Sequence, residues 1–306
     1  MLFTPPQMPP AKPPVVTVWI HGTKVDECLP APFAKIAKNI GNIIFQHKMG
    51  LHHTTEFNQH HYDAIRAEIL ATSKPVIFQS EYLYSFGWSG ELNPQARKNA
   101  SQELFNNLKQ LHNLIQEKTG QSPEFILISH SHGGNVILHM AEINDPEGFQ
   151  LTISKVILLA CPVQKRTEHL IGSPMFKRIY SLHSHTDMIQ IVDMQGLHIK
   201  KKVRRPLFSQ RHFNPHPKLV QVAIRWKNCP TWHDDDRIIN EVVLKHLTNS
   251  IKLINILKKN RGLFHVEFQL LPFLRHLTSV ITYLDELFEK DAHCPSHKDH
   301  DIVVEL

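Results

Sequence analysis

Short apolar runs alternate with stretches of helical periodicity along almost the whole of this 306-residue chain, and few folds accommodate that order. Residues 15–20 read V-V-T-V-W-I, a β-branched run typical of a strand buried on both faces. Strand and helix then alternate nearly throughout, which predicts the α/β class, with a mostly parallel central sheet and helices on both faces. We expect strands over 15–20, 76–78, 124–128, 153–160, 178–182 and 219–226, and helices over 32–45, 61–72, 94–120, 136–143, 238–257 and 270–288.

The domain organisation follows from composition. Six prolines fall within residues 1–14, which predicts an extended N-terminal arm that cannot pack as a helix. With 42% hydrophobic residues, the rest of the chain can bury a large core, and no internal repeat divides it. We therefore expect one domain over 15–290, with a basic insertion at about 195–215, and a polar C-terminal tail over 291–306.

Charge and cysteine usage bear on location and partners. The net charge of +6 favours anionic surfaces, and basic residues concentrate in the insertion, as Lys200, Lys201, Lys202, Arg204 and Arg205 followed by Arg211. This stretch suits either an anionic membrane surface or a solvated loop, and no nucleic-acid fold accompanies it. The four cysteines lie far apart and prolines occupy the N-terminus, so we expect a cytoplasmic protein without a signal peptide or a transmembrane segment, membrane-peripheral at most.

The residues that most suggest chemistry follow the predicted strand at 124–128. Residues 129–133 read S-H-S-H-G, an S-x-S-x-G pattern that places Ser131 on a tight turn between strand and helix. Such a turn projects a serine hydroxyl outward, and the next backbone N–H, of His132, lies at a helix N-terminus where it can stabilise an oxyanion. Ser129 does not fit the pattern, because the residue two positions after it is not glycine. The pattern therefore makes Ser131 the candidate nucleophile.

In these segments the chain resembles the α/β-hydrolase superfamily, specifically its lipase and serine-esterase branch. I-H-G-T at residues 20–23 is similar to the H-G loop of lipases, and Y-S-L-H-S-H-T-D at residues 180–187 is similar to the strand end that carries the triad acid. The resemblance covers about residues 15–265 and implies the chain order nucleophile, acid, histidine. It also implies that Thr23 supplies a second oxyanion N–H and that Gly22 borders the substrate.

The resemblance directs attention to an acid and a base. Asp187 sits just beyond a predicted strand, where a carboxylate can orient a histidine; Asp193 is the rival, and a turn-capping aspartate is the alternative role. Among 23 histidines, two fit the position of the general base. His233 requires the shorter loop after the last strand and is preferred, whereas His265 precedes the C-terminal helix and is the alternative. His130 and His132 flank Ser131 but face away from its hydroxyl, so neither is expected to be the base.

Three further groups of residues are candidates for binding. Trp88 follows a predicted strand at the edge where ligands bind in α/β sheets, so it either borders the substrate or packs in the core. The basic insertion lies where this superfamily inserts lid segments. The tail carries residues that bind metals only adventitiously, His293, Cys294, His297 and His300, so no metal and no organic cofactor is expected.

The resulting hypothesis is a serine hydrolase that cleaves a carboxylic ester, of a lipid or another acylated substrate, through Ser131, Asp187 and His233 or His265. Two alternatives remain open from the sequence. An acyltransferase uses the same triad with a different acceptor, and a non-catalytic protein keeps the same scaffold to bind a membrane or a protein partner.

Overall fold

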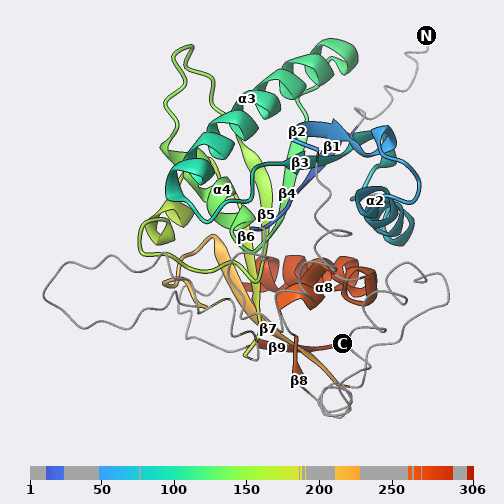
Figure 1. Ribbon diagram of the computed structural model, residues 1–306, viewed down its shortest axis with the longest axis vertical. Helices are drawn as coiled ribbons and strands as arrows, with labels where there is room; N and C mark the ends of the chain where they lie inside the picture. The colour runs from blue at the N-terminus through green and yellow to red at the C-terminus, as the bar shows by residue number, and fades with distance from the viewer. Residues whose placement is uncertain are drawn as a thin grey trace, which may run out of the picture.

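The computed structural model describes residues 12–23, 48–75, 77–185, 187, 190, 211–227, 261–263, 265–269, 271–291 and 302–306. These form one twisted sheet, ordered β2-β3-β1-β4-β5-β6-β7-β8, with β9 also pairing with β7 (Figure 1). Strands β3, β1, β4, β5, β6, β7 and β9 run parallel, while β2 and β8 are antiparallel to their neighbours. The strands are β1 Val15–Ile20, β2 Gly50–His53, β3 Leu83–Gly87, β4 Glu124–His130, β5 Ile153–Leu159, β6 Ile179–His183, β7 Leu219–Trp226, β8 Arg261–Gly262 and β9 Ile302–Glu305.

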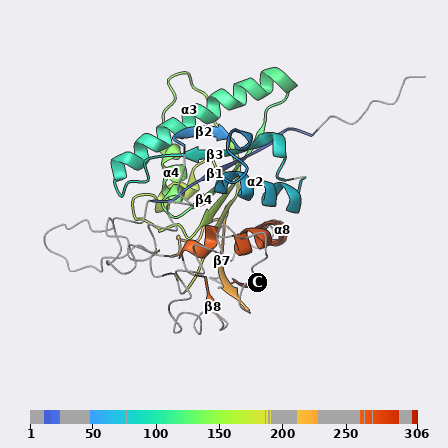
Figure 2. The same cartoon turned by 45° about the vertical axis from the view of Figure 1, so that its right-hand side comes forward.

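Helices cover both faces of this sheet. Helices α3 (Pro94–Thr119) and α4 (Gly133–His139) lie on one face, and α2 (Tyr62–Ser73) and α8 (Leu271–Asp291) lie on the other (Figures 1 and 2). Alternate residues of each strand supply the two cores: Val16 and Val18 of β1 pack with α3 and α4, whereas Trp19 packs with α2 and α8. Each central strand is buried on both faces, as its β-branched sequence predicts.

Helix α3 shows how local sequence sets the bounds of an element. Asn93 caps its N-terminus by accepting a hydrogen bond from the backbone N–H of Gln95, and Pro94 occupies the first turn, where no N–H is needed. Gly120 ends the helix in the left-handed conformation, at φ 72°.

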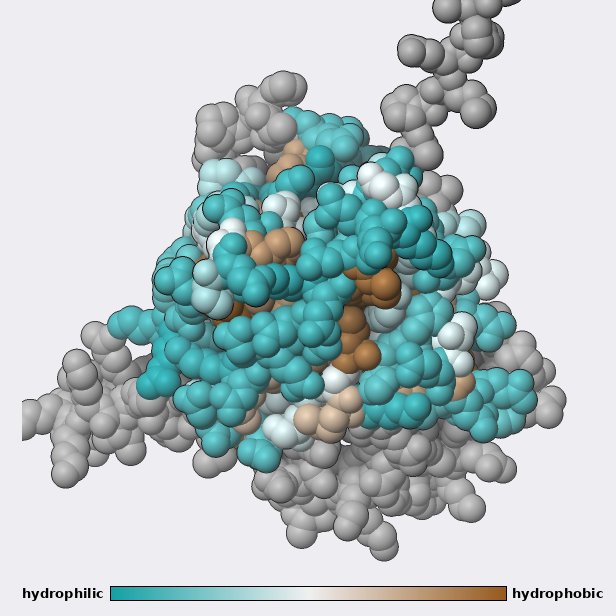
Figure 3. Space-filling view, turned by 90° about the horizontal axis from the view of Figure 1, so that it is seen from above, coloured by the Kyte–Doolittle hydropathy of each residue, from teal (hydrophilic) through white to brown (hydrophobic). Residues whose placement is uncertain are grey.

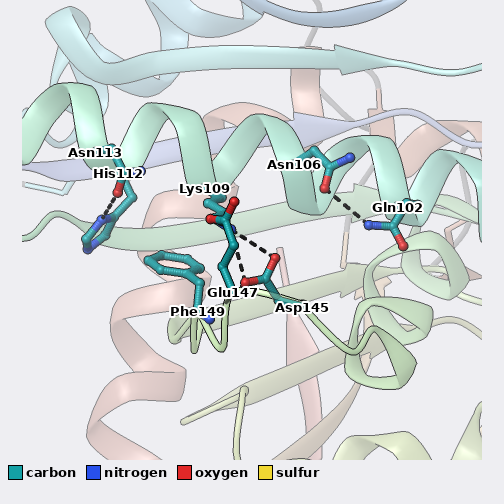
Figure 4. Close-up of polar contacts among 8 residues, drawn as sticks. All are labelled: Gln102, Asn106, Lys109, His112, Asn113, Asp145, Glu147 and Phe149. Carbon is teal, nitrogen blue, oxygen red and sulfur yellow. Dashed lines mark hydrogen bonds and ion pairs between the residues drawn. The ribbon is translucent and has the colours of Figure 1, made fainter.

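The outer surface of α3 holds the loop before β5 in place. Lys109 lies between two carboxylates, 2.9 Å from Asp145 Oδ1 and 2.7 Å from Glu147 Oε2 (Figure 4). Hydrogen bonds to both carboxylates raise the pKa of Lys109. Because these groups are solvent-exposed or close to solvent, the contacts orient the loop more than they stabilise the fold.

The predicted fold class is confirmed, but not every element lies where the periodicity places it. The strand expected at 76–78 is wrong: the backbone N–H groups of Ile77 and Phe78 both donate to Lys74 O in a turn, and the strand begins at Leu83. Phe78 is apolar because it is buried beneath α2 and α8, not because it belongs to the sheet. Strand β2 was not expected.

Other expected segments fall outside the described residues. These are residues 1–11 of the arm, the helices at 32–45 and 238–257, and residues 195–210 of the basic insertion. The tail predicted from composition contains β9, whose residues pair with 222–225 of β7, so the end of the chain is part of the sheet.

The molecular surface seen from above is largely hydrophilic, with small apolar patches separated by polar side chains (Figure 3). Within the described part of the chain, no helix combines the length and the apolar character needed to cross a bilayer.

Strand β6 ends in a cluster of histidines in which His183 is buried and His185 and His212 are exposed. His183 Nε2 lies 2.8 Å from His212 Nε2, and the ring of His185 packs edge-on against His183 at 5.7 Å. Burial, followed by the charges of His212, His185 and Arg211, lowers the pKa of His183 to about 3. The folded protein therefore resists protonation at a position where the unfolded chain accepts a proton readily.

We predict that replacing Gly133 with alanine destabilises the protein. A Cβ at this position would lie 2.5 Å from the backbone oxygen of His21 and 2.9 Å from that of Ile20, so the start of α4 or the end of β1 would have to move. Overpacking of this kind costs about 1–3 kcal/mol in the free energy of unfolding, measurable by urea denaturation. Gly172→Ala is the matched control, because its Cβ would meet nothing closer than His216 Nε2 at 3.4 Å; equal losses in both variants would contradict the prediction.

Acid should destabilise the protein in part through His183. Its pKa is about 3 in the folded state against an ordinary 6.5, so below pH 6.5 only the unfolded chain gains the proton. Above that pH this group does not lower the free energy of unfolding. Between pH 6.5 and pH 3 it lowers the free energy of unfolding by at most about 1.4 kcal/mol per pH unit. His183→Gln should flatten the dependence, measured as unfolding free energy from pH 7 to pH 4; a slope as steep as that of the wild type would refute this origin.

Candidate active site

Ser131 occupies a strained turn at the carboxyl end of β4. Its backbone has φ 52°, in the left-handed region that non-glycine residues rarely adopt, and its N–H donates to Leu159 O of β5 at 2.8 Å. Helix α4 begins at Gly133. Strand, left-handed serine and helix thus follow one another in the order that the S-x-S-x-G pattern predicts. Ser129, by contrast, is fully buried within β4 and pairs with Ile20 and Leu158.

The loop after β1 lies directly against this turn. A Cβ on Gly22 would lie 2.8 Å from the Ser131 Cβ, so only glycine permits the approach. Strands β1 and β4 are neighbours, and the next strands along the chain lie on opposite sides of this pair, β2 and β3 beyond β1 and β5 beyond β4. Ligands in open α/β sheets bind beyond the carboxyl ends of strands at such a reversal. The residues at 21–23 and Ser131 occupy that position.

Asp187 and His265 form a buried pair. His265 Nδ1 lies 2.7 Å from Asp187 Oδ2, and the two residues are 3% and 1% exposed. Asp187 follows β6, and His265 begins the short 3-10 helix η9 (His265–Gln269) that precedes α8. A neutral or protonated imidazole donates its Nδ1 proton to this carboxylate, which leaves Nε2 for other chemistry.

Backbone and side-chain contacts hold the loop after β6, which carries Asp187, in place. The second carboxylate oxygen of Asp187 accepts a hydrogen bond from the backbone N–H of Gln190 at 3.0 Å. The Arg211 guanidinium donates to the backbone oxygens of His185 and Asp187, at 3.1 and 2.8 Å. Sequence reasoning grouped Arg211 with the basic insertion and missed this role, because nothing local links it to a loop more than twenty residues earlier.

His130, the residue before Ser131, packs against the histidine of this pair. Its Nε2 lies 2.9 Å from the backbone oxygen of His265, and the two rings are 4.5 Å apart between centroids. Burial, followed by the nearby charge of His265, lowers the pKa of His130 well below its ordinary value. The buried pair is therefore placed next to the serine turn through a neighbouring side chain.

The residues expected to stabilise an oxyanion flank Ser131. His132 follows it in right-handed helical geometry at the start of α4, and Thr23 follows Gly22 in the loop after β1. The Thr23 hydroxyl is buried and has no hydrogen-bond partner among the described residues.

Trp88 lies in the interior, 2% exposed, and holds the loop after β1. Its indole N–H donates to the backbone oxygen of His21 at 2.9 Å, and its backbone N–H donates to His21 Nε2, also at 2.9 Å. The two rings stack at 5.7 Å. In this structure Trp88 thus contacts the segment that carries Gly22.

Not all of the candidate residues can be located. His233 and Asp193 fall outside the described residues, as do Lys200, Lys201, Lys202, Arg204 and Arg205. Six of the described candidates lie around the carboxyl ends of β1, β4 and β6: Ser131, His132, Gly22, Thr23, Asp187 and His265. Among the described residues, no group of three His, Cys, Asp or Glu side chains is arranged to hold a metal ion.

Comparisons with known proteins give distant likenesses. No family model matches the sequence, and no curated protein matches it. Among solved structures, the siderophore hydrolase EstB from Aspergillus fumigatus is 12% identical over 92% of this chain and 93% of that one, with a TM-score of 0.37. Phospholipase PlaB from Legionella pneumophila, in complex with thio-NAD, is 14% identical over 48% of this chain, with a TM-score of 0.28. This chain covers 25% of that phospholipase.

The fold itself is evident from the architecture. A mostly parallel sheet is covered by helices on both faces, and its strand order reverses beside β1. A left-handed serine joins the next strand to a helix, and a carboxylate and a histidine from later segments meet near it. The chain has the α/β-hydrolase fold.

Proposed function

We propose that the protein is a serine hydrolase that cleaves a carboxylic ester through Ser131, His265 and Asp187. The observation that carries the proposal is the buried 2.7 Å contact between His265 and Asp187, set beside the left-handed turn of Ser131. A serine hydroxyl is a weak nucleophile unless a base takes its proton, and an imidazole backed by a carboxylate is such a base. The three side chains come in the chain order Ser, Asp, His.

The reaction then proceeds in two halves. His265 Nε2 accepts the proton of the Ser131 hydroxyl as Oγ attacks the ester carbonyl, and the imidazolium returns that proton to the departing alcohol. The acyl group remains on Ser131 as an ester. Water, deprotonated by the same imidazole, attacks this acyl-enzyme, and the imidazolium gives the proton to Ser131 Oγ as the carboxylic acid leaves. Asp187 holds the imidazole in the required tautomer and stabilises its protonated form.

The proposal assigns the base to His265. Loop length alone favours His233 instead. His265 Nδ1 lies 2.7 Å from Asp187 Oδ2, and this contact with the carboxylate is what supports His265 as the base. His265 also lies against His130, the neighbour of the nucleophile.

We assign the oxyanion to the backbone N–H groups of His132 and Thr23. The negative charge develops on the ester oxygen next to Ser131, where the N-terminus of α4 and the loop after β1 meet. Gly22 keeps this approach open because any Cβ there would collide with Ser131. We place lipids and other acylated molecules first among the substrates, on the resemblance of I-H-G-T and S-H-S-H-G to lipase motifs.

The central test is Ser131→Ala. We expect loss of short-chain ester hydrolysis by about a thousandfold or more, and loss of fluorophosphonate labelling, with the fold intact by circular dichroism. Ser129→Ala is the matched control, because it removes a buried hydroxyl two residues earlier and should leave labelling unchanged. Labelling that persists in Ser131→Ala would defeat the proposal.

The identity of the base is tested by a second pair of variants. His265→Asn removes the imidazole that contacts Asp187 and should lower kcat by about a thousandfold or more, while His233→Asn should retain most of the activity. The opposite result would transfer the role of base to His233. Esters of increasing acyl length, assayed with the wild type, then distinguish a lipid substrate from a short-chain one.

The buried hydroxyl of Thr23 gives a separate prediction. Because it has no partner among the described residues, it is free to donate to the oxyanion beside the Thr23 N–H. Thr23→Val removes the hydroxyl at nearly constant volume and should lower kcat by about 100-fold. Thr23→Ser keeps the hydroxyl and should stay close to the wild type. Equal kcat values in the two variants would show that the hydroxyl takes no part.

A further inference from the structure

His130 is the last residue of β4 and the immediate neighbour of Ser131, yet it has no role in the reaction proposed above. Its side chain is 1% exposed and lies between two other parts of the site. On one side its Nδ1 faces Gly22, where an added Cβ would lie 3.0 Å away. On the other side its ring packs against that of His265. The imidazole thus touches both the loop after β1 and the segment that carries the base.

The contact with His265 fixes the tautomer of His130. Its Nε2 lies 2.9 Å from a backbone carbonyl oxygen, which can only accept a hydrogen bond, so Nε2 carries the proton. Nδ1 is then the unprotonated nitrogen, and it has no hydrogen-bond partner among the described residues. A buried acceptor without a partner costs free energy that an apolar side chain of similar shape would not incur. Packing alone therefore gives no reason for a histidine here, whereas the hydrogen bond to His265 does.

Helix η9 is held at both ends by such contacts. His130 donates to the backbone oxygen of His265 at its start, and the Tyr62 hydroxyl donates to the backbone oxygen of Gln269 at its end. The contact between Asp187 and His265 is made through the His265 imidazole. The carboxylate orients the ring but does not determine where the backbone beneath it lies, and a displacement of about 1 Å is enough to slow a reaction that needs aligned atoms.

We propose that His130 is a positioning residue, whose Nε2–H anchors the backbone carbonyl of His265 and so sets the distance between the base and the adjacent Ser131. This inference rests on the proposed function, because it assigns a role relative to the same triad. The hydrogen bond ties the residue next to the nucleophile to the backbone of the base. A shift of β4 therefore moves the serine and the histidine together.

The environment of His130 suits a role that persists through the reaction. Burial and the nearby charge of His265 lower its pKa, so it remains neutral when His265 takes up the serine proton. His130 keeps its proton on Nε2 while His265 changes its charge. No step of the reaction needs a proton from His130.

The test compares His130→Gln with His130→Asn. The Gln side chain can place its amide N–H near the position of the imidazole Nε2–H, whereas the shorter Asn side chain places its amide near that of Nδ1. We expect His130→Gln to keep kcat within about threefold of the wild type, and His130→Asn to lower kcat by about 100-fold with little change in KM. Equal kcat values in the two variants, or a loss confined to KM, would overturn the proposal.

A second measurement does not depend on activity. The proton on His265 Nδ1, shared with Asp187, gives a far-downfield NMR resonance that can be assigned with His265→Asn. We expect the resonance to persist in His130→Gln and to shift or broaden in His130→Asn. An unchanged resonance in His130→Asn would count against positioning by His130. If His130→Asn does not fold, His130→Phe, which keeps a ring but lacks a donor, replaces it in both measurements.

The two proposals fail in different ways. If the wild type neither hydrolyses esters nor reacts with a fluorophosphonate, the proposed function falls, and the NMR comparison still shows whether His130 positions His265. If the wild type is active and both His130 variants match it in kcat and in the resonance, only the positioning role falls.

Discussion

The buried contact between Asp187 and His265 joins parts of the chain that are 78 residues apart. It connects the loop after β6 to η9, which leads directly into α8, the helix that covers one face of the sheet with α2. Two polar groups are removed from water here, and their mutual hydrogen bond offsets that cost only while the geometry holds. The loop contacts made by Gln190 and Arg211, and the His130 contact with η9, all maintain this geometry.

Close backbone packing places Ser131 next to this arrangement. Gly133 brings the start of α4 against the end of β1, and Gly22 brings the loop after β1 against Ser131. Within this packing Ser131 adopts a left-handed backbone conformation, which is strained for a residue that has a side chain. Trp88 and His21, joined by two hydrogen bonds and a stacked contact, keep the same loop from moving away. The site therefore lies at the carboxyl ends of β1 and β4. The close contacts of Gly133, Gly22 and Trp88 build it together, and no single motif does so.

Two histidines flank Ser131, and they differ in what surrounds them. His132 lies at the start of α4, where its backbone N–H is the feature that the proposed mechanism uses. His130 contacts His265, and its proposed role depends on its side chain. A chain with 23 histidines offers no sequence signal that separates these uses, since both residues lie within one short polar segment. Only their neighbours in space distinguish them.

Local sequence was enough to determine most strands and helices and the serine turn, because β-branched runs, helical periodicity, capping residues and glycines act over a few residues. The N-cap at Asn93, the stop at Gly120 and the strand–serine–helix order around Ser131 are of this kind. Ile77 and Phe78 misled the prediction because burial under two helices and burial in a sheet select the same apolar residues. Tertiary structure alone decided the partner of Asp187, the contact of His130 and the pairing of β9 with β7. Each is a contact between residues that are far apart in the chain, and no local sequence pattern predicts such a contact.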